Sequence, residues 1–543
     1  MKHFSYVGKK LFNLCSVSAC FLKSALCLVA CRCYAFILLE VNSFWIHLCY
    51  FVSLFFLGFW SLKALKPRTP FRPRDLDLFF TSVSAATVSS MSTVEMEVFS
   101  NSQLIILTFL MFLGGEVFTS MVGLQFRKSQ LKMILWNASS SAKIEPMAPV
   151  SSFDQVNDEP SPGIVVVTSP GFENLESAAN TQYDRSLDAD VSIKYNAIKF
   201  LGFVVLGYLL VVHVLGITLL SLYMTLVSSA RNVLKNKGLN MMTFSVFTIV
   251  STFGSCGFVP TNENIVVFRK NSGLLLILIP QALLGDTLFP SCLRFSVWFL
   301  GKFFKRKESN YLLTKTRKVG YFHLLPARHS LMLLFTVFGF ILIEMIMFFA
   351  MEWDSMALGG MNPYQKIIGV FFQTVNSRHA GETIVDLSAI SPAILVLFVF
   401  MMYLPPYTSF LPRGDVKPPP KLHKKKGNGR KLVDYLLFSP VSYLFIFTML
   451  ICVTERQKMK EDPLNFSLFN IVIEVVSAYG NVGFSTGYSC ERRLNPNGNI
   501  CNAKSYGFSG AWSDGGKMIL ILVMFYGRLK KFSTKGGKAW IVM

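Results

Sequence analysis

The chain has 543 residues, of which 52% are hydrophobic and 15% are charged. Soluble domains carry about 25% charged residues, so this composition excludes an ordinary soluble domain, a disordered chain and a disulfide scaffold, and it indicates many segments that lie in lipid. Lysine and arginine number 53 against 31 acidic residues, a net charge of +22. In a soluble protein this excess suggests nucleic-acid binding, whereas in a membrane protein it indicates basic cytoplasmic loops.

Long apolar segments recur along the chain. A helix needs about 20 apolar residues to cross a hydrocarbon core of about 30 Å, and we expect eight spanning helices in four pairs. The pairs are Phe44–Leu62 with Gln103–Leu124, Phe200–Val227 with Gly273–Phe299, Ser330–Ala350 with Pro392–Phe410, and Leu432–Val453 with Lys517–Phe532.

Between the members of each pair lies an apolar segment that is too short to span. The four are Asp77–Ser90, Thr243–Cys256, Tyr364–Arg378 and Phe469–Gly480, and each ends in a cluster of small or polar residues. The repeated order predicts long helix, half-helix, turn, extended strand and long helix. Because non-helical backbone at membrane depth is tolerated only inside protein or along a water-filled cavity, four such segments predict one pore with four quasi-equivalent walls.

The half-helices favour a cation as the permeant species. If each enters from outside, its C-terminal end, which carries partial negative charge from unpaired carbonyls, points at the membrane centre. A small residue after each end, usually glycine, lets backbone carbonyls face the pore. One such glycine would be explained as a helix cap, but the fourfold repetition favours a filter.

Three polar loops separate the apolar blocks. Two are basic, Lys302–Lys318 and Arg413–Lys431, and they lack the interleaved aromatic residues that stack on bases, so we expect cytoplasmic loops and no nucleic-acid partner. The third, about Lys128–Lys194, is mixed in charge and is expected to be disordered. A basic cluster from Lys63 to Arg74 would lie outside, and the sequence offers no explanation beyond a pore vestibule or lipid headgroups.

Four stretches carry a resemblance to a known family. They run from Phe79 to Thr93, Phe258 to Asn264, Val375 to Thr383 and Ser477 to Phe484, and they closely resemble the plant high-affinity potassium transporter (HKT) family of the Trk/Ktr/HKT cation transporters. The resemblance implies an all-α integral membrane protein of the plasma membrane. It also implies four helix–pore-loop–helix pseudo-repeats around a single central ion pore, with both termini cytoplasmic.

The resemblance further implies one filter residue in each unit. The four residues, which would be transient ligands of Na⁺, are Ser90, Gly257, Gly381 and Gly483. The residues that flank them are Val88, Ser89, Ser255, Cys256, His379, Ala380, Asn481 and Val482.

Ser90 resembles the sodium-selective members, because members with glycine at this position tend to pass K⁺ as well. A serine adds bulk and a hydroxyl to one wall of the ring, which should cost the larger K⁺ more than Na⁺, although the physical origin of such selectivity is debated. We therefore expect a passive sodium-selective transporter. The alternative is a sodium–potassium symporter or a potassium-permeable cation transporter.

Arg528 lies near the end of the last apolar segment and has two explanations. It can snorkel to the interface with Lys530 and Lys531, or it can be a functional intramembrane charge. The residues alone do not separate the two, but in HKT relatives an arginine at the matching position is a barrier to permeation below the filter. Pro405-Pro406 breaks the sixth segment where relatives have a constriction, and a plain helix end is the favoured explanation.

Other signals are weaker. No cluster of catalytic or metal-ligating residues stands out, so we expect neither an enzyme nor a cofactor, only permeant Na⁺ or, in the alternative, K⁺. Cys490 and Cys501 flank an outer loop, which leaves a disulfide open, and Asn465 begins a glycosylation sequon. By family analogy the partners are the lipid bilayer and a second copy in a homodimer. A cytosolic regulatory subunit also stays open, with nothing in the chain to support it.

These inferences divide the chain into eight parts. They are an N-terminal extension (1–43), the first unit (44–125), a polar cytoplasmic loop (126–196), the second unit (197–304), a basic loop (305–326), the third unit (327–411), a basic Pro/Lys linker (412–431) and the fourth unit (432–543). We interpret the extension as cytoplasmic or at the membrane surface rather than as a signal peptide.

Overall fold

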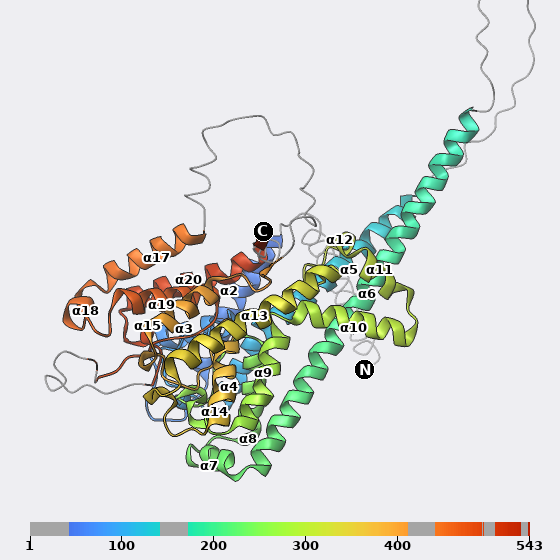
Figure 1. Cartoon of the computed structure of the whole chain (residues 1–543). Helices are drawn as coiled ribbons and strands as arrows, with labels where there is room; N and C mark the ends of the chain where they lie inside the picture. Colours follow the sequence, from blue (N-terminus) through green and yellow to red (C-terminus); the bar gives the residue numbers. More distant parts are fainter. Residues whose placement is uncertain are drawn as a thin grey trace, which may run out of the picture.

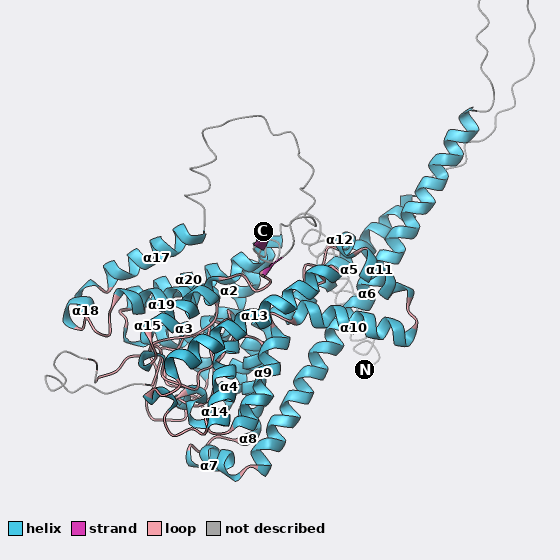
Figure 2. Ribbon diagram, in the orientation of Figure 1, coloured by secondary structure: helices cyan, strands magenta, loops and turns pink. Residues whose placement is uncertain are grey.

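The computed structural model describes residues 43–141, 172–410, 440–490, 492, 505–533 and 541–542. Over these ranges the chain is almost entirely helical, with one short pairing between β1 (Ser409–Phe410) and β2 (Ile541–Val542) (Figure 2). The expected all-α fold is confirmed. The N-terminal extension up to residue 42 and the basic linker at 412–431 lie outside the described residues.

Each of the four units contains a helix of 12 to 14 residues that lies between two other helices in the chain. The first unit consists of α2 (Ser43–Ala64), α3 (Asp75–Ala86), η1 (Met96–Val98), α4 (Asn101–Gly114) and α5 (Glu116–Ser141). The second consists of α6 (Phe172–Leu226), α7 (Ser228–Asn236), α8 (Met241–Phe253), η2 (Asn264–Phe268), α9 (Ser272–Gly285) and α10 (Phe289–Phe304).

The third and fourth units repeat this order. After α11 (Lys307–Thr314) and α12 (Thr316–Val319), the third consists of α13 (Ala327–Glu352), η3 (Met356–Leu358), α14 (Pro363–Asn376), η4 (Leu387–Ala389) and α15 (Pro392–Tyr403). The fourth consists of α17 (Pro440–Thr454), α18 (Arg456–Glu461), α19 (Leu468–Gly480), η6 (Phe508–Ala511) and α20 (Asp514–Ser533).

The short helices α3, α8, α14 and α19 lie where the sequence predicts half-helices. Their starts are set by local chemistry: the Asn240 side chain accepts the backbone N–H of Met242 at 2.9 Å, and the Ser467 hydroxyl accepts that of Asn470 at 3.2 Å. Pro363 occupies the first turn of α14, where its missing N–H costs nothing. The extended strand expected after each turn is instead irregular chain that ends in a single 3₁₀ turn: η1, η2, η4 or η6.

Two of the expected long spans are bent, and a third is shorter than expected. The Gln103–Leu124 span bends by 54° between α4 and α5, and the Gly273–Phe299 span bends by 82° between α9 and α10. Gly115 interrupts the first helix with an extended backbone (φ −59°, ψ 146°). The Pro392–Phe410 span ends at Tyr403, because Pro405 and Pro406 cannot continue a helix.

Fewer helices meet a strict length-and-hydropathy criterion for spanning than the eight we expect. Among the described residues, Phe44–Ala64, Val191–Leu226 and Ala327–Glu352 meet it individually, and the two bent pairs raise the number to five. The segments α15, α17 and α20 do not.

The polar loop expected to be disordered is partly helical. Helix α5 continues to Ser141 and α6 begins at Phe172, so the two lie side by side and project beyond the other helices (Figure 1). Leu124 on α5 and Ala197, Ile198 and Leu201 on α6 belong to one buried apolar cluster, which lies at the edge of the polar sequence. The basic loop at 305–326 likewise contains α11 and α12.

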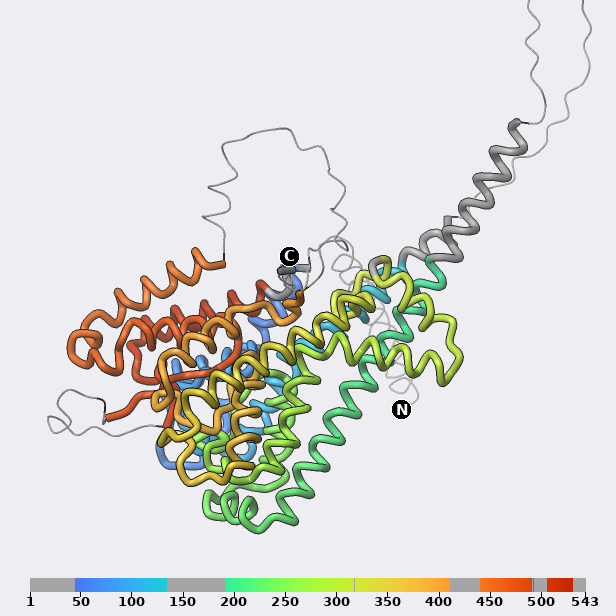
Figure 3. Tube along the Cα trace, viewed as in Figure 1, coloured from blue at the N-terminus to red at the C-terminus, as the bar shows by residue number. Residues whose placement is uncertain are grey.

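Polarity is distributed as expected for a protein in lipid. Large apolar side chains are exposed along α6, α13 and α17, for example Val211, Val214, Phe335, Ile343 and Phe445. Serine and threonine are instead buried at the centre, around the ends of the short helices. The first and last units, at the two ends of the colour scale, pack together through contacts of α2 and α3 with α20 (Figure 3).

Candidate selectivity filter

The four predicted filter residues share an unusual backbone conformation. The φ angles are 53° at Ser90, 86° at Gly257, 64° at Gly381 and 101° at Gly483. Each residue follows the end of its short helix by three to five positions. Glycine adopts this region readily and other residues seldom do, so Ser90 is the strained member of the set.

The four residues lie against one another in sequence order. A Cβ added at Gly257 would overlap the carbonyl of Ala380, and one added at Gly381 would overlap that of Val482. One added at Gly483 would overlap the side chain of Ser90.

The remaining contact joins the first and second units. The Cys256 side chain lies near the Ser90 backbone, and α4 packs against α8. The four pore loops therefore form a closed ring.

The flanking residues show where the fourfold repetition fails. Val88, Ser255 and Asn481, two positions before the ring residue in units one, two and four, also have positive φ angles of 53°, 57° and 53°. His379 holds that position in the third unit and is not in this conformation. The third pore loop therefore takes a different path into the ring.

Hydrogen bonds behind the ring connect neighbouring units. The Asn481 amide donates to the Ser89 hydroxyl at 2.7 Å, which joins units four and one. His379 joins units three and two, with Nδ1 3.0 Å from Asp286 and Nε2 2.9 Å from the Thr287 hydroxyl.

Two of these partners are not predicted from the sequence. Nothing in the sequence around Thr287 indicates a role beside the ring. Asp286 carries such an indication, because it is a carboxylate in an apolar segment and such residues are usually functional.

Another buried carboxylate that the sequence analysis missed is Glu382, which directly follows the third ring glycine. Its side chain is fully buried and accepts a hydrogen bond from the Thr252 hydroxyl at the end of α8. It therefore joins units three and two a second time. Its position next to Gly381 was the available signal.

A second set of glycines, on the second helix of three units, lies in close contact with the C-terminal ends of the short helices. A Cβ at Gly114, Gly285 or Gly527 would overlap the carbonyl of Ala86, Phe253 or Tyr479, respectively. Each of these carbonyls belongs to the residue four positions before a ring residue. The second helix of units one, two and four thus touches the short helix of its own unit at an equivalent point. The third unit departs again, since α15 contains no glycine.

Arg528 is buried, with 1% of its surface exposed, so it does not snorkel. Its guanidinium donates to the carbonyl of Gly114, where the α4–α5 pair bends, and lies 5.8 Å from the centre of the Phe51 ring. It is held at the junction of the first and fourth units. Lys530 follows it on α20 and donates to the Tyr479 hydroxyl.

A cavity of about 70 Å³ lies beside the ends of α14 and α19. Its wall includes His379 and Asn481, which flank the ring, and the segment after α15. The lining residues are Asp286, Arg378, His379, Met402, Tyr403, Leu404, Pro405, Pro406, Tyr479, Gly480, Asn481, Gly527 and Lys530. The cavity therefore adjoins the ring on the side of the short-helix C-termini.

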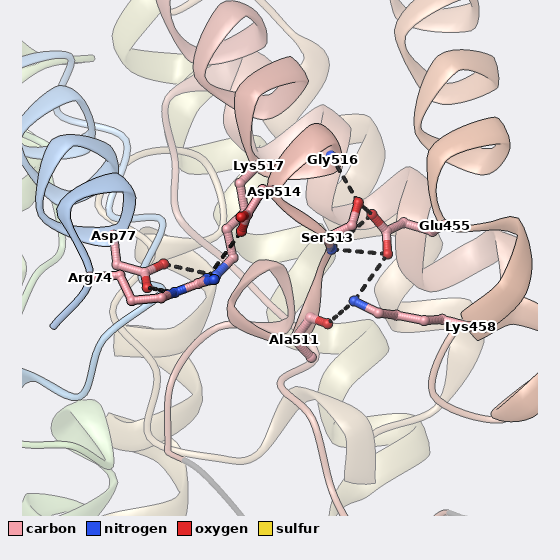
Figure 4. Close-up of polar contacts among 9 residues, drawn as sticks. All are labelled: Arg74, Asp77, Glu455, Lys458, Ala511, Ser513, Asp514, Gly516 and Lys517. Carbon is pink, nitrogen blue, oxygen red and sulfur yellow. Dashed lines mark hydrogen bonds and ion pairs between the residues drawn. The ribbon is translucent and has the colours of Figure 1, made fainter.

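The basic cluster from Lys63 to Arg74, which the sequence left unexplained, is partly neutralised by acidic side chains. These lie near the N-terminal ends of helices, away from the ring. Arg74 contacts Asp77 at 3.0 Å and Asp514 at 3.1 Å, and Lys517 contacts Asp77 at 2.8 Å (Figure 4). These pairs join the start of α3 to the start of α20. The same view shows Glu455 accepting the backbone N–H and hydroxyl of Ser513 within the fourth unit.

Two modification signals from the sequence have different outcomes. The Asn465 side chain is fully buried, and its amide donates to Asp462 at 2.9 Å and to the Ser489 carbonyl at 3.0 Å, so the sequon is not accessible for glycosylation. Cys490 is disulfide-bonded. Cys501, with which the sequence leaves a disulfide open, lies outside the described residues.

Comparison with known proteins identifies the family. The chain matches the TrkH family, described as cation transport protein, over residues 164–411 and 412–535. It is 49% identical to the cation transporter HKT1;3 of Oryza sativa subsp. japonica, over 92% of this chain and 91% of that one. It is 50% identical to the sodium transporter HKT1 of Arabidopsis thaliana, over 89% and 92%. The crystal structure of the potassium transporter TrkH from Vibrio parahaemolyticus aligns over 91% of this chain and 85% of that one, at 15% identity and a TM-score of 0.45. The chain therefore belongs to the HKT cation transporters within the TrkH family, and it is a membrane ion transporter rather than an enzyme.

Proposed function

We propose that this protein is a passive, sodium-selective cation transporter of the plasma membrane, with a filter formed by Ser90, Gly257, Gly381 and Gly483. The observation that carries the proposal is the closed ring of four left-handed residues, of which three are glycine and one is serine. Both termini would be cytoplasmic, so that the short helices enter from outside.

Electrostatics supports a cation as the permeant ion. The C-terminal ends of α3, α8, α14 and α19 converge on the ring, and helix C-termini carry about half a negative charge each. Backbone carbonyls near the ring would replace the hydration shell of the ion. We propose that Arg528, anchored on Gly114, supplies an opposing positive charge that limits permeation.

Selectivity for sodium rests on Ser90. Its side chain lies against Gly483 of the fourth unit, whereas the other three ring positions carry no side chain. The relative named sodium transporter is 50% identical to this chain, and this supports the same preference here.

The test is the substitution Ser90→Gly. Glycine accepts the φ angle of 53° without strain, so the variant should fold, and it should become clearly permeable to K⁺. Two-electrode voltage clamp in oocytes, with Na⁺ and K⁺ exchanged in the bath, measures the change as a positive shift of reversal potential in high K⁺. Ser92→Gly, two positions beyond the ring, is the control and should keep the selectivity of the parent.

The proposal predicts a difference between these two variants. If Ser90→Gly excluded K⁺ as strictly as the parent, the assignment of Ser90 to the filter would be wrong. A parent current that required both ions together would instead favour sodium–potassium symport.

A further inference from the structure

The segment after α15 is non-helical and borders the cavity beside the ring. Helix α15 has 12 residues and ends at Tyr403, and Leu404, Pro405 and Pro406 then line the cavity opposite Gly480 and Asn481. Irregular backbone at this depth must have its carbonyls satisfied by protein or by water in a cavity. The group that hydrogen-bonds to these carbonyls therefore fixes the position of the Leu404–Pro406 segment.

Arg378 supplies that group. Its Nη2 atom donates to the carbonyl of Pro405 at 2.8 Å and to that of Pro406 at 3.1 Å. Arg378 has 7% of its surface exposed and its guanidinium lies 5.5 Å from the centre of the Phe340 ring on α13. The side chain is thus fixed between α13 and the segment.

Arg378 is also part of the third pore loop, three residues before Gly381. The equivalent positions in the other units are Thr87, Gly254 and Gly480, none of which has a side chain long enough to reach a neighbouring helix. The third unit is the one whose second helix ends early and lacks the supporting glycine. An arginine in this unit therefore replaces the backbone contact that holds the second helix in the others.

We propose that Arg378 is a positioning residue that fastens the Leu404–Pro406 segment to the third pore loop and so sets how freely ions pass between the cavity and the ring. This inference rests on the proposed pore. A guanidinium can bond two carbonyls in a fixed geometry, whereas an ammonium cannot reproduce that geometry.

The first experiment measures the segment directly. In the full-length protein, Leu404→Cys is introduced as a reporter, and its modification by a charged thiol reagent is followed by intact mass, with the parent protein as background. Adding Arg378→Gln or Arg378→Lys should raise the modification rate about tenfold, the factor that corresponds to losing a hydrogen bond from a charged donor. Arg378→Lys keeps the charge, so it provides the test if Arg378→Gln does not fold.

Arg294 offers a matched control. Its guanidinium also donates to two backbone carbonyls, those of Leu325 at 2.9 Å and Leu313 at 3.4 Å, and it lies outside the lining of the cavity. Arg294→Gln should leave the modification rate of the Leu404→Cys reporter unchanged. If both arginine substitutions raised the rate equally, general loosening would be the cause and the inference would be overturned.

The second experiment measures ion flow. Arg378→Lys should change the shape of the current–voltage relation at unchanged surface expression, while the reversal potential in mixed Na⁺ and K⁺ stays that of the parent. Unchanged modification rate and unchanged current shape together would refute the role of Arg378. Failure of the Ser90→Gly prediction shows itself separately, as an unchanged reversal potential in that variant.

Discussion

Two separate constraints act on a single residue in the ring, Gly381. Its φ angle of 64° costs an L-residue about 1–2 kcal/mol, and a Cβ there would also overlap the Val482 carbonyl of the next unit. The overlap presses on backbone rather than on a flexible side chain, so the neighbouring pore loop would have to move.

We predict that Gly381→Ala lowers the cation current by about tenfold or more, because displacement of ring carbonyls weakens the ion coordination proposed for them. Oocyte current divided by surface protein is the measurement. Gly360→Ala separates the two constraints, since Gly360 has a φ angle of 72° but nothing within reach of an added Cβ. Equal loss of current in the two variants would mean that backbone strain alone, and not the ring contact, matters.

Single residues also show what the sequence can reveal about the site. The four ring positions follow from the repeated short segments and the family resemblance. The partners behind the ring do not, since Thr252 and Glu382 lie 130 residues apart and meet only in the folded chain. Arg378 was visible as the end of a predicted half-helix, but its acceptors at Pro405 and Pro406 were not.

The helices themselves depart from prediction where glycine and proline alter the backbone inside an apolar run. Hydropathy treats Gln103–Leu124 as one span, and the bend at Gly115 has no hydropathic signature. The short helices are predicted well because polar caps and small residues mark both ends. The long ones are predicted less well because their limits depend on contacts with other helices.

The contact of α20 with α19 at Gly527 leads to a prediction about helix packing. Gly527→Ala on α20 should displace the last turn of α19, because the added methyl would overlap the Tyr479 carbonyl. We expect a loss of about 1–3 kcal/mol, typical of overpacking, measured as a lower melting temperature of the detergent-purified protein, together with reduced current.

Helix α13 contains a suitable control. Gly339 has nothing within 4 Å of an added Cβ, so Gly339→Ala should be neutral or should stabilise the protein by up to about 1 kcal/mol through helix propensity. A melting temperature for Gly527→Ala at or above that of Gly339→Ala would contradict the proposed contact.

In the whole molecule, the first and last units contact each other. Lys517 and Asp77 are 2% and 7% exposed and pair at 2.8 Å, although 440 residues separate them. Removing one member of a buried ion pair leaves an uncompensated charge, which typically costs about 3–5 kcal/mol. The pair therefore helps to join the first and last units at the starts of α3 and α20.

We predict that Asp77→Asn lowers the melting temperature of the purified protein substantially, and that adding Lys517→Met recovers much of the loss because no buried charge then remains unpaired. The nearby pair of Lys63 with Asp75 has side chains 43% and 63% exposed. Asp75→Asn should therefore cost less than about 1 kcal/mol. Similar melting temperatures for the two asparagine variants would rule out a special role for the buried pair.

At the scale of the whole chain, the sequence predicts the architecture but not the contacts between distant segments. Four units, their order and their short helices follow from the repeated apolar pattern. The sequence predicts disorder for part of the α5–α6 pair, because composition reports polarity and not the apolar cluster that contains Leu124 and Leu201. The basic cluster near Arg74 gained its explanation only when the fold brought Asp514 to it.

The third unit differs from the other three at its pore loop, its second helix and its arginine, while the other walls of the ring keep their common geometry. A pore made from four identical chains cannot do this, because every substitution appears on all four walls at once. Here each quarter of the ring is encoded separately, so the roles proposed for Ser90 in selectivity and for Arg378 in ion passage belong to different quarters. A single substitution can therefore change one wall of the ring while the residues of the other three walls stay as they are.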